Sequence, residues 1–193
     1  MNNANLVDFL KTIYPISSQL AEKLVLDFNY YLLAKNSILI KENSIVKQTY
    51  FLESGYIRSF VIDHFGNEVT TNIYFYPCFV NDFSSFFKQI PAKQNFHAIT
   101  ECKIWTMSFE NVEKNFHNSP EFREFGRLLI LNHYDLVCER VLSMIKDNAE
   151  IRYYKLLSKH KEIFKFIPLK IIASYLGITD TSLSRIRKTI SHK

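Results

Sequence analysis

The side chains best suited to ligand chemistry lie near the C-terminus, where residues 167–190 read IPLKIIASYLGITDTSLSRIRKTI. Short hydroxyl side chains occur there together with two arginines and two lysines. A guanidinium donates paired hydrogen bonds to two acceptors at once, whereas a lysine ammonium acts as a point charge. Gathered on one helix face, such side chains would bind a polyanion that also offers hydrogen-bonding edges.

Two short helices joined by a tight turn would hold these side chains. The first is predicted from about Pro168 to Leu176, because proline suits the first position of a helix. Gly177 would end it, since glycine tolerates a left-handed backbone, and Thr179 would cap the second helix. Spacings of three and four predict a buried set of Ile172, Ala173, Leu176, Ile178, Leu183 and Ile186, with Ile190 next in the second helix.

The other face of the second helix is polar or basic. It carries Asp180, Thr181, Ser184, Arg185 and Lys188. This is the arrangement of a helix-turn-helix whose second helix enters the DNA major groove. An ordinary helical hairpin with a solvated basic face is the alternative, so the rest of the chain must decide.

The charge of the chain is unevenly distributed. Residues 150–193 contain ten Lys or Arg and three Asp or Glu, a net charge of +7. Residues 1–149 contain 14 basic and 16 acidic side chains, a net charge of −2. The positive excess therefore coincides with the two-helix motif, which is the electrostatic pattern of a duplex-binding module.

Several classes of protein are not indicated. No apolar run approaches the roughly 20 residues of a membrane span, and the N-terminus lacks the features of a secretory signal, so we expect a cytoplasmic protein. Cys78, Cys102 and Cys138 have no metal-binding spacing and are expected to be reduced. The six histidines are scattered and no catalytic motif is present, so neither an enzyme nor a metal site is predicted.

The first half of the chain has strand periodicity. Short β-branched and aromatic runs separated by turn signals extend from about residue 34 to 109, after a helical segment over residues 6–28. Many short strands at regular spacing indicate an antiparallel barrel or jelly roll, with residues 63–67 as a hairpin loop. The predicted strands are 37–41, 49–53, 56–62, 69–76, 78–80, 97–100 and 103–108.

A long helix is predicted from residue 121 to 146, and its length would be roughly 37 Å at a rise of 1.5 Å per residue. This length exceeds what one small barrel needs, so part of its apolar stripe could face a second subunit. Packing within the same chain is the alternative. A further amphipathic helix over residues 149–164 leads into the two-helix motif.

This order of elements resembles the Crp/Fnr family of bacterial transcription regulators. The resemblance lies in residues 50–80 (YFLESGYIRSFVIDHFGNEVTTNIYFYPCFV), in the long helix, and most closely in residues 149–190, which resemble Crp/Fnr-like proteins common in Bacteroidetes. It implies an α+β fold: a cyclic-nucleotide-binding-like antiparallel β-roll over residues 1–120, a dimerisation helix over 121–148 and a winged-helix or helix-turn-helix domain over 149–193. The β-wing is expected to be shortened or lost.

The resemblance implies a homodimer that binds double-stranded DNA and regulates transcription, with RNA polymerase as a candidate further partner. Arg185 is the expected reader of base edges. Asp180 would accept a hydrogen bond from cytosine or complement the helix N-terminus. The residues expected to contact DNA are Lys170, Thr179, Asp180, Thr181, Ser182, Ser184, Arg185, Arg187 and Lys188.

The effector site departs from the family pattern. Cyclic-nucleotide binders of the family carry a Gly-Glu pair for the ribose and an Arg-Ser/Thr pair for the phosphate, whereas this chain has Asn81 and Asp82, and Lys93 in a segment without arginine. Asn81, Asp82 and Lys93 are the candidate effector residues: Asp82 could hold a hydroxyl group and Lys93 could meet an anion, but together they make a poor cyclic-AMP site. We therefore expect a different ligand or none, and no cofactor. The aromatic residues Phe75, Tyr76, Phe79, Phe83, Phe86 and Phe87 would line an apolar pocket or fill the core. The alternative function is a ligand-sensing β-roll module without operator-specific DNA binding.

Overall fold

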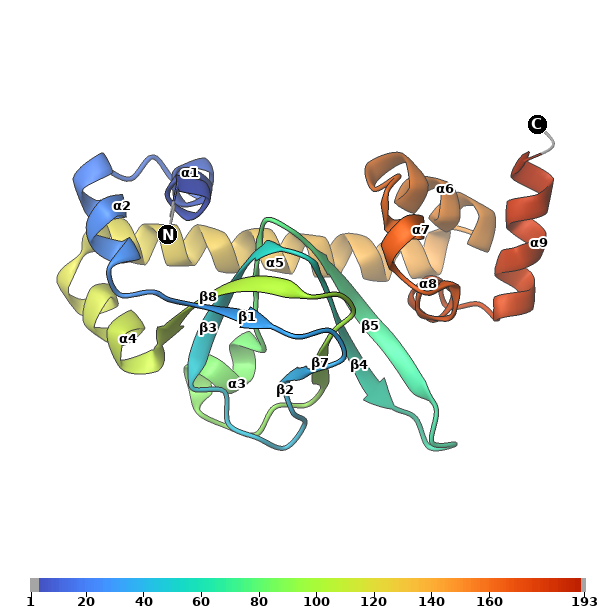
Figure 1. Ribbon diagram of the computed structural model, residues 1–193, viewed down its shortest axis with the longest axis horizontal. Coiled ribbons are helices and arrows are strands. Elements are labelled where there is room, and N and C mark those ends of the chain that lie inside the picture. Colours follow the sequence, from blue (N-terminus) through green and yellow to red (C-terminus); the bar gives the residue numbers. More distant parts are fainter. Residues whose placement is uncertain (1–3, 192–193) are drawn as a thin grey trace.

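The computed structural model describes residues 4–191 and consists of a β-roll, a long helix and a helical C-terminal domain (Figure 1). The long helix α5 (Pro120–Lys146) runs along the molecule, with the roll beside it and the C-terminal domain at its far end. Helices α1 (Ala4–Ile13) and α2 (Ser18–Val25) lie over the opposite end of α5.

The roll is built from two four-stranded antiparallel sheets, which confirms the predicted jelly roll. One sheet has the order β1-β8-β3-β6 and the other β2-β7-β4-β5. The strands of the first sheet are β1 (Asn29–Leu33), β8 (Cys102–Ser108), β3 (Gln48–Ser54) and β6 (Cys78–Val80). Those of the second are β2 (Ile38–Ile40), β7 (Asn95–Ala98), β4 (Tyr56–Ile62) and β5 (Glu68–Phe75).

The predicted strands agree with these to within two residues at each end, but three predictions of the helical pattern are wrong or incomplete. The helical segment over 6–28 ends at Val25, and β1 follows it. The helix over 149–164 divides into α6 (Ala149–Lys159) and α7 (Ile163–Phe166), because His160 leaves the helical conformation and Ile163 enters the core. Helices α3 (Phe83–Lys88) and α4 (Phe109–Asn118) have no counterpart in the prediction.

Helix α5 lies in two different environments. Its first turns bury Phe122, Phe125 and Gly126 against the roll, and Ser119 caps it by accepting a hydrogen bond from the Phe122 N–H at 3.1 Å. Beyond these turns, apolar side chains remain exposed along the helix, so the described part of this chain covers them only in part. They are Ile130, Leu131, Tyr134, Leu136, Val137, Val141, Leu142, Met144 and Ile145.

The C-terminal domain shares a core with the outside of the second sheet. Tyr56 and Ile73 of that sheet belong to the same buried cluster as Leu156, Ile172 and other side chains of the C-terminal helices. Strand β5 lies at the edge of its sheet, and the Thr70 N–H donates to the Ser174 hydroxyl of α8 (Leu169–Leu176) at 2.8 Å. Helix α8 therefore covers an edge strand that would otherwise be free to pair.

The described part of the C-terminal domain, residues 149–191, consists of helices and the turns that connect them, without a strand. Its last helix is α9 (Asp180–Ser191). Three cysteine thiols of the described chain are free. Burial raises the pKa of Cys78 to about 12 and also raises that of Cys102, which keeps both thiols protonated.

Gly177 between α8 and α9 has a φ of +67°, and a Cβ there would lie 2.6 Å from the Met144 Cε on α5. We predict that Gly177→Ala lowers the free energy of unfolding by roughly the 1–2 kcal/mol of left-handed strain, because the terminal methyl group of the flexible, partly exposed Met144 can move aside. Gly66→Ala is the matched control, because Gly66 has a φ of +84° and open space around its Cα.

Urea unfolding would be measured for both variants, for Met144→Ala, and for Met144→Ala combined with Gly177→Ala. This double-mutant cycle separates the energy of the contact between residues 144 and 177 from the backbone strain at Gly177. A clearly larger loss for Gly177→Ala than for Gly66→Ala would contradict this prediction and show that the packing of Met144 against the turn also contributes.

Candidate nucleic-acid interface

Helices α8 and α9 form the predicted helix-turn-helix. Pro168 lies one position before α8, as its N-cap residue, and Gly177 ends the helix in the left-handed conformation. The Gly177 N–H donates to the Ser174 carbonyl and the Ile178 N–H to the Ala173 carbonyl, both at 3.0 Å. These bonds occupy carbonyls that a helix end leaves free, so the turn has a defined geometry.

Helix α9 begins as the sequence predicts. The Thr179 hydroxyl oxygen accepts a hydrogen bond from the Ser182 N–H at 3.2 Å, which is an N-cap interaction. Leu183 is fully buried and Ile186 is partly buried in the core of the domain. The side chain of Ile190 lies outside the described residues.

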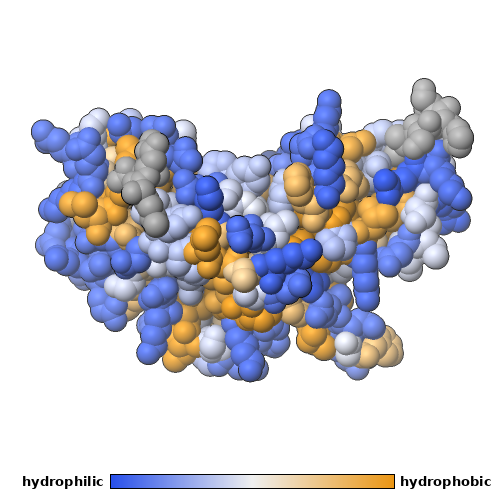
Figure 2. Space-filling view, viewed as in Figure 1, coloured by the Kyte–Doolittle hydropathy of each residue, from blue (hydrophilic) through white to orange (hydrophobic). Residues whose placement is uncertain are grey.

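The outer face of α9 exposes the predicted polar and basic set, which is Asp180, Thr181, Ser184, Arg185 and Lys188. Ser182 is half-buried, and Thr179 and Lys170 are exposed nearby on the same motif. Figure 2 shows mainly hydrophilic and neutral side chains over α9 at the right of the molecule. The structure therefore brings the predicted residues to one end of the C-terminal domain.

The cations of this face differ in their surroundings. Within residues 4–191, the salt bridges of the C-terminal domain join Lys155 to Asp147, Lys159 to Glu139 and Lys165 to Glu162, and none involves Arg185, Lys188 or Lys170. The Arg187 guanidinium instead lies 5.9 Å from the centre of the Phe164 ring. Arg185, Lys188 and Lys170 can therefore meet an anion without first breaking an ion pair.

Of the predicted effector residues, Asp82 and the backbone of Lys93 form hydrogen bonds within the described part of the fold, and the side chain of Asn81 does not. Asp82 caps α3, because its Oδ1 accepts from the Ser85 N–H at 3.0 Å, and its Oδ2 accepts from the Lys93 N–H at 3.2 Å. Lys93 meets Asp82 through its backbone, and its side chain is exposed. Asn81 is 3% exposed, and neither polar atom of its side chain has a hydrogen-bond partner among the described residues.

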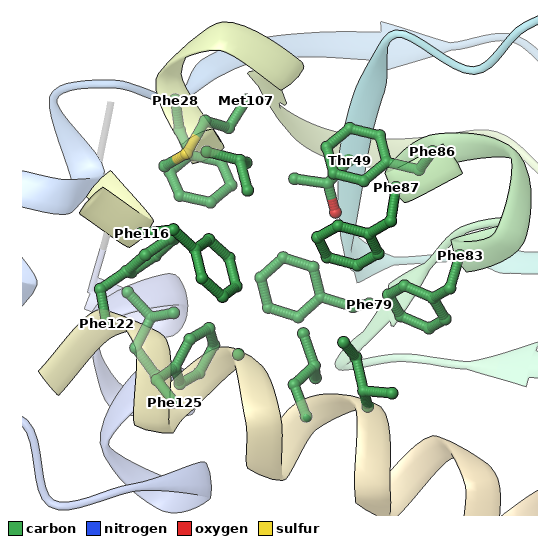
Figure 3. A pocket seen from close by; sticks show the side chains of 15 residues that line it. Phe28, Thr49, Phe79, Phe83, Phe86, Phe87, Met107, Phe116, Phe122 and Phe125 are labelled. Carbon is green, nitrogen blue, oxygen red and sulfur yellow. The ribbon is translucent and has the colours of Figure 1, made fainter. Parts of the chain in front are cut away.

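An apolar cavity of about 40 Å³ lies between the roll and the start of α5 (Figure 3). Four of the six aromatic residues noted in the sequence line it, namely Phe79, Phe83, Phe86 and Phe87, together with Phe116, Phe122 and Phe125 from α4 and α5. The Phe79 ring lies between those of Phe83 and Phe125, and Thr49 contributes the one polar side chain of the lining.

The two other aromatic residues lie elsewhere. Phe75 stacks on His160 of the C-terminal domain with a centroid distance of 3.7 Å, and Tyr76 packs 5.7 Å from Tyr56. The sequence prediction did not include the contributions of α4 and α5. The aromatic start of the long helix, PEFREF, differs from its aliphatic remainder and was the available signal.

Residues 4–191 contain neither a candidate metal site nor a candidate membrane span. No group of three His, Cys, Asp or Glu side chains in this range could hold a metal ion. None of the helices in this range is both long and apolar enough to cross a membrane.

The family of cyclic nucleotide-binding domains matches residues 32–119 of the chain. No curated protein matches it in sequence. Among solved structures, FixK2 from Bradyrhizobium japonicum is 13% identical with a TM-score of 0.73, over 86% of this chain and 85% of that one. CLP of Xanthomonas campestris, a c-di-GMP responsive global regulator, is 12% identical with a TM-score of 0.70, over 91% and 92%.

A third similar structure, from Eubacterium rectale, is assigned to the Crp/Fnr family of transcriptional regulators. It is 15% identical with a TM-score of 0.71, over 93% of this chain and 88% of that one. At these identities the likeness establishes the fold. Residues 32–119 therefore match the cyclic nucleotide-binding domain family, and the chain as a whole shares its fold with these three solved structures.

Proposed function

We propose that the chain is a homodimeric, sequence-specific DNA-binding regulator of transcription. The observation that carries this proposal is the exposed polar and basic face of α9 on a capped helix-turn-helix, with Arg185 and Lys188 outside every ion pair of the described residues. The fold of its structural neighbours supports a regulatory role. Such a protein acts on the chromosome in the cytoplasm, and activation would require contact with RNA polymerase.

Arg185 is the proposed reader of sequence, because a guanidinium can pair with two acceptors on a guanine edge. Thr181 and Asp180 lie in the first turn of α9, where base edges are within reach. Thr179, Ser182, Lys188 and Lys170 are suited to phosphates, as is Arg187 if it leaves the Phe164 ring. Asp180 either accepts from a cytosine amine or stabilises the helix N-terminus.

The uncovered apolar stripe of α5 supports a homodimer. Tyr134, Val137 and Val141 recur at spacings of three and four and are 61%, 45% and 52% exposed. That spacing suits a parallel pairing of two long helices, which would bury the stripe on both copies. The two α9 helices would then meet successive major grooves, roughly 34 Å apart, on a near-palindromic operator.

Cyclic AMP is not the proposed ligand. Both carboxylate oxygens of Asp82 already accept backbone hydrogen bonds, and the segment around Lys93 supplies no arginine for a phosphate. The apolar cavity has a single polar lining side chain, so it offers almost no hydrogen-bonding partners to a ribose or a cyclic phosphate.

The DNA-reading residues can be tested by substitution. Arg185→Ala should cost about 1–3 kcal/mol of operator binding and relax the preference at one base pair per half-site, since it removes a bidentate contact. Lys188→Ala should weaken binding to all sequences alike and lower the salt slope by about one phosphate. Selection of duplexes from a random pool, followed by anisotropy titrations at several salt concentrations, would measure both.

Lys23→Ala, an exposed lysine of α2, is the control and should leave binding unchanged. An unchanged sequence preference in Arg185→Ala would show that Arg185 is not the reader. If the wild-type protein bound no duplex even at low salt, the alternative of a ligand-sensing module without operator binding would be favoured.

The dimer can be tested through the stripe. We expect Val137→Glu to dissociate the dimer, because it would bury an unpaired carboxylate in the interface. Asn132→Glu introduces the same charge at an exposed position on the other side of α5 from Val137 and should leave the dimer intact. Sedimentation velocity at micromolar concentration distinguishes the two, and a monomeric wild-type protein would contradict the proposal.

If cyclic AMP is not the ligand, its calorimetric titration into the protein should give no saturable heat of binding. We also predict that Asp82→Ala lowers the free energy of unfolding by about 1–2 kcal/mol, because the cap of α3 and the bond to the Lys93 N–H are lost. Binding of cyclic AMP that disappears in Asp82→Ala would assign the carboxylate to the ligand instead. Cyclic di-GMP, to which CLP responds, belongs in the same titration.

A further inference from the structure

The C-terminal end of α8 is held by two arginines from outside the helix-turn-helix. Arg140 of α5 donates through Nη2 to the Tyr175 carbonyl at 2.8 Å. Arg152 of α6 donates through Nε and Nη2 to the Leu176 carbonyl at 3.0 and 2.9 Å. These are terminal carbonyls of α8, where the helix dipole is negative, so cations are favoured there.

Arg140 makes a second contact with Tyr175. Its guanidinium lies 3.8 Å from the centre of the Tyr175 ring, in addition to the hydrogen bond to the carbonyl of the same residue. No carboxylate within residues 4–191 pairs with it, and burial lowers its pKa. A half-buried guanidinium whose partners are a carbonyl and an aromatic face of the same residue holds the end of α8 against α5.

A second contact lies one turn further along α5. Met144 packs against Gly177, whose missing Cβ leaves room for the methionine methyl group. Residues at a spacing of four lie on the same face of a helix, so Arg140 and Met144 hold the turn of the helix-turn-helix together. The apolar stripe of α5 runs past this same segment.

We propose that Arg140 is a positioning residue that sets the half-site spacing accepted by the dimer. This inference rests on the proposed function, since it requires a dimer held by α5 and a duplex read by α9. Arg140 fixes the first helix of the motif to the dimerisation helix, and thereby fixes the separation of the two α9 helices. It does so without contacting DNA, because its donors face α8.

The experiment measures the affinity of the full-length protein for palindromic duplexes with the selected spacing and with spacings one base pair longer and shorter. Arg140→Gln should lose about ten- to a hundredfold in affinity at the selected spacing, by the usual strength of a charged hydrogen bond. The ratio between the selected and the altered spacings should fall toward one. The salt slope and the affinity for an isolated half-site should stay at the wild-type values.

Two variants and one control separate positioning from folding. Tyr175→Leu keeps the carbonyl and removes the ring, so it should lower the spacing ratio in the same direction, whereas Arg140→Lys should restore part of the affinity. Arg127→Gln, which removes an exposed arginine paired with Glu124 on the same helix, should change nothing.

A wild-type spacing ratio in both Arg140→Gln and Tyr175→Leu would overturn the inference while leaving the regulator intact. A half-site affinity that falls as much as the palindrome affinity would also overturn it, because Arg140 would then support the fold of the reader alone. Failure of the wild-type protein to bind any duplex would instead contradict the proposed function itself.

Discussion

One helix has to satisfy three sets of contacts along its length. The first turns of α5 contribute Phe122 and Phe125 to the core of the roll. Its middle leaves an apolar stripe uncovered, and its last turns hold the helix-turn-helix through Arg140 and Met144. Because a helix is stiff over this length, a change of packing at one end alters the orientation of what is attached at the other.

The cavity beside the start of α5 lies at one end of this arrangement. Its walls come from the roll, from α3 and α4, and from α5, and nearly all of its lining is aromatic or aliphatic. The rings touch at centroid distances of 5–6 Å, as between Phe116 and Phe122 at 5.2 Å. A cluster of large rings around a small void can repack at modest cost, since no hydrogen bond has to break.

The predictable parts of the molecule are those that depend on neighbouring residues. The αL glycine at Gly177 and the Thr179 cap are local signals, and the strands of the roll follow from two-residue periodicity. Strand β1 was not predicted because its tyrosines and leucines continue the apolar pattern of α2, and the turn at Leu26 and Asp27 between the two elements contains neither glycine nor proline. The role of Asp82 could not be deduced, since its partners include the backbone of Lys93, 11 residues away.

The contacts between the roll and the C-terminal domain were beyond any local signal. Thr70 and Ser174 are 104 residues apart, and neither residue type indicates a partner. The same holds for the stack of Phe75 on His160, which ties β5 to the end of α6. Such pairings arise from the way in which two complete domains meet, and sequence periodicity carries no information about that.

The cover that α8 provides over β5 limits how the protein can change shape. If the helix-turn-helix moved away from the roll, the Thr70 N–H would lose its acceptor and the edge strand β5 of the second sheet would be exposed to solvent. An exposed edge strand can pair with a strand of another chain. Large movements of the helix-turn-helix away from the roll would therefore favour self-association of the protein. Small rotations that keep the Ser174 hydroxyl bonded to the Thr70 N–H would not.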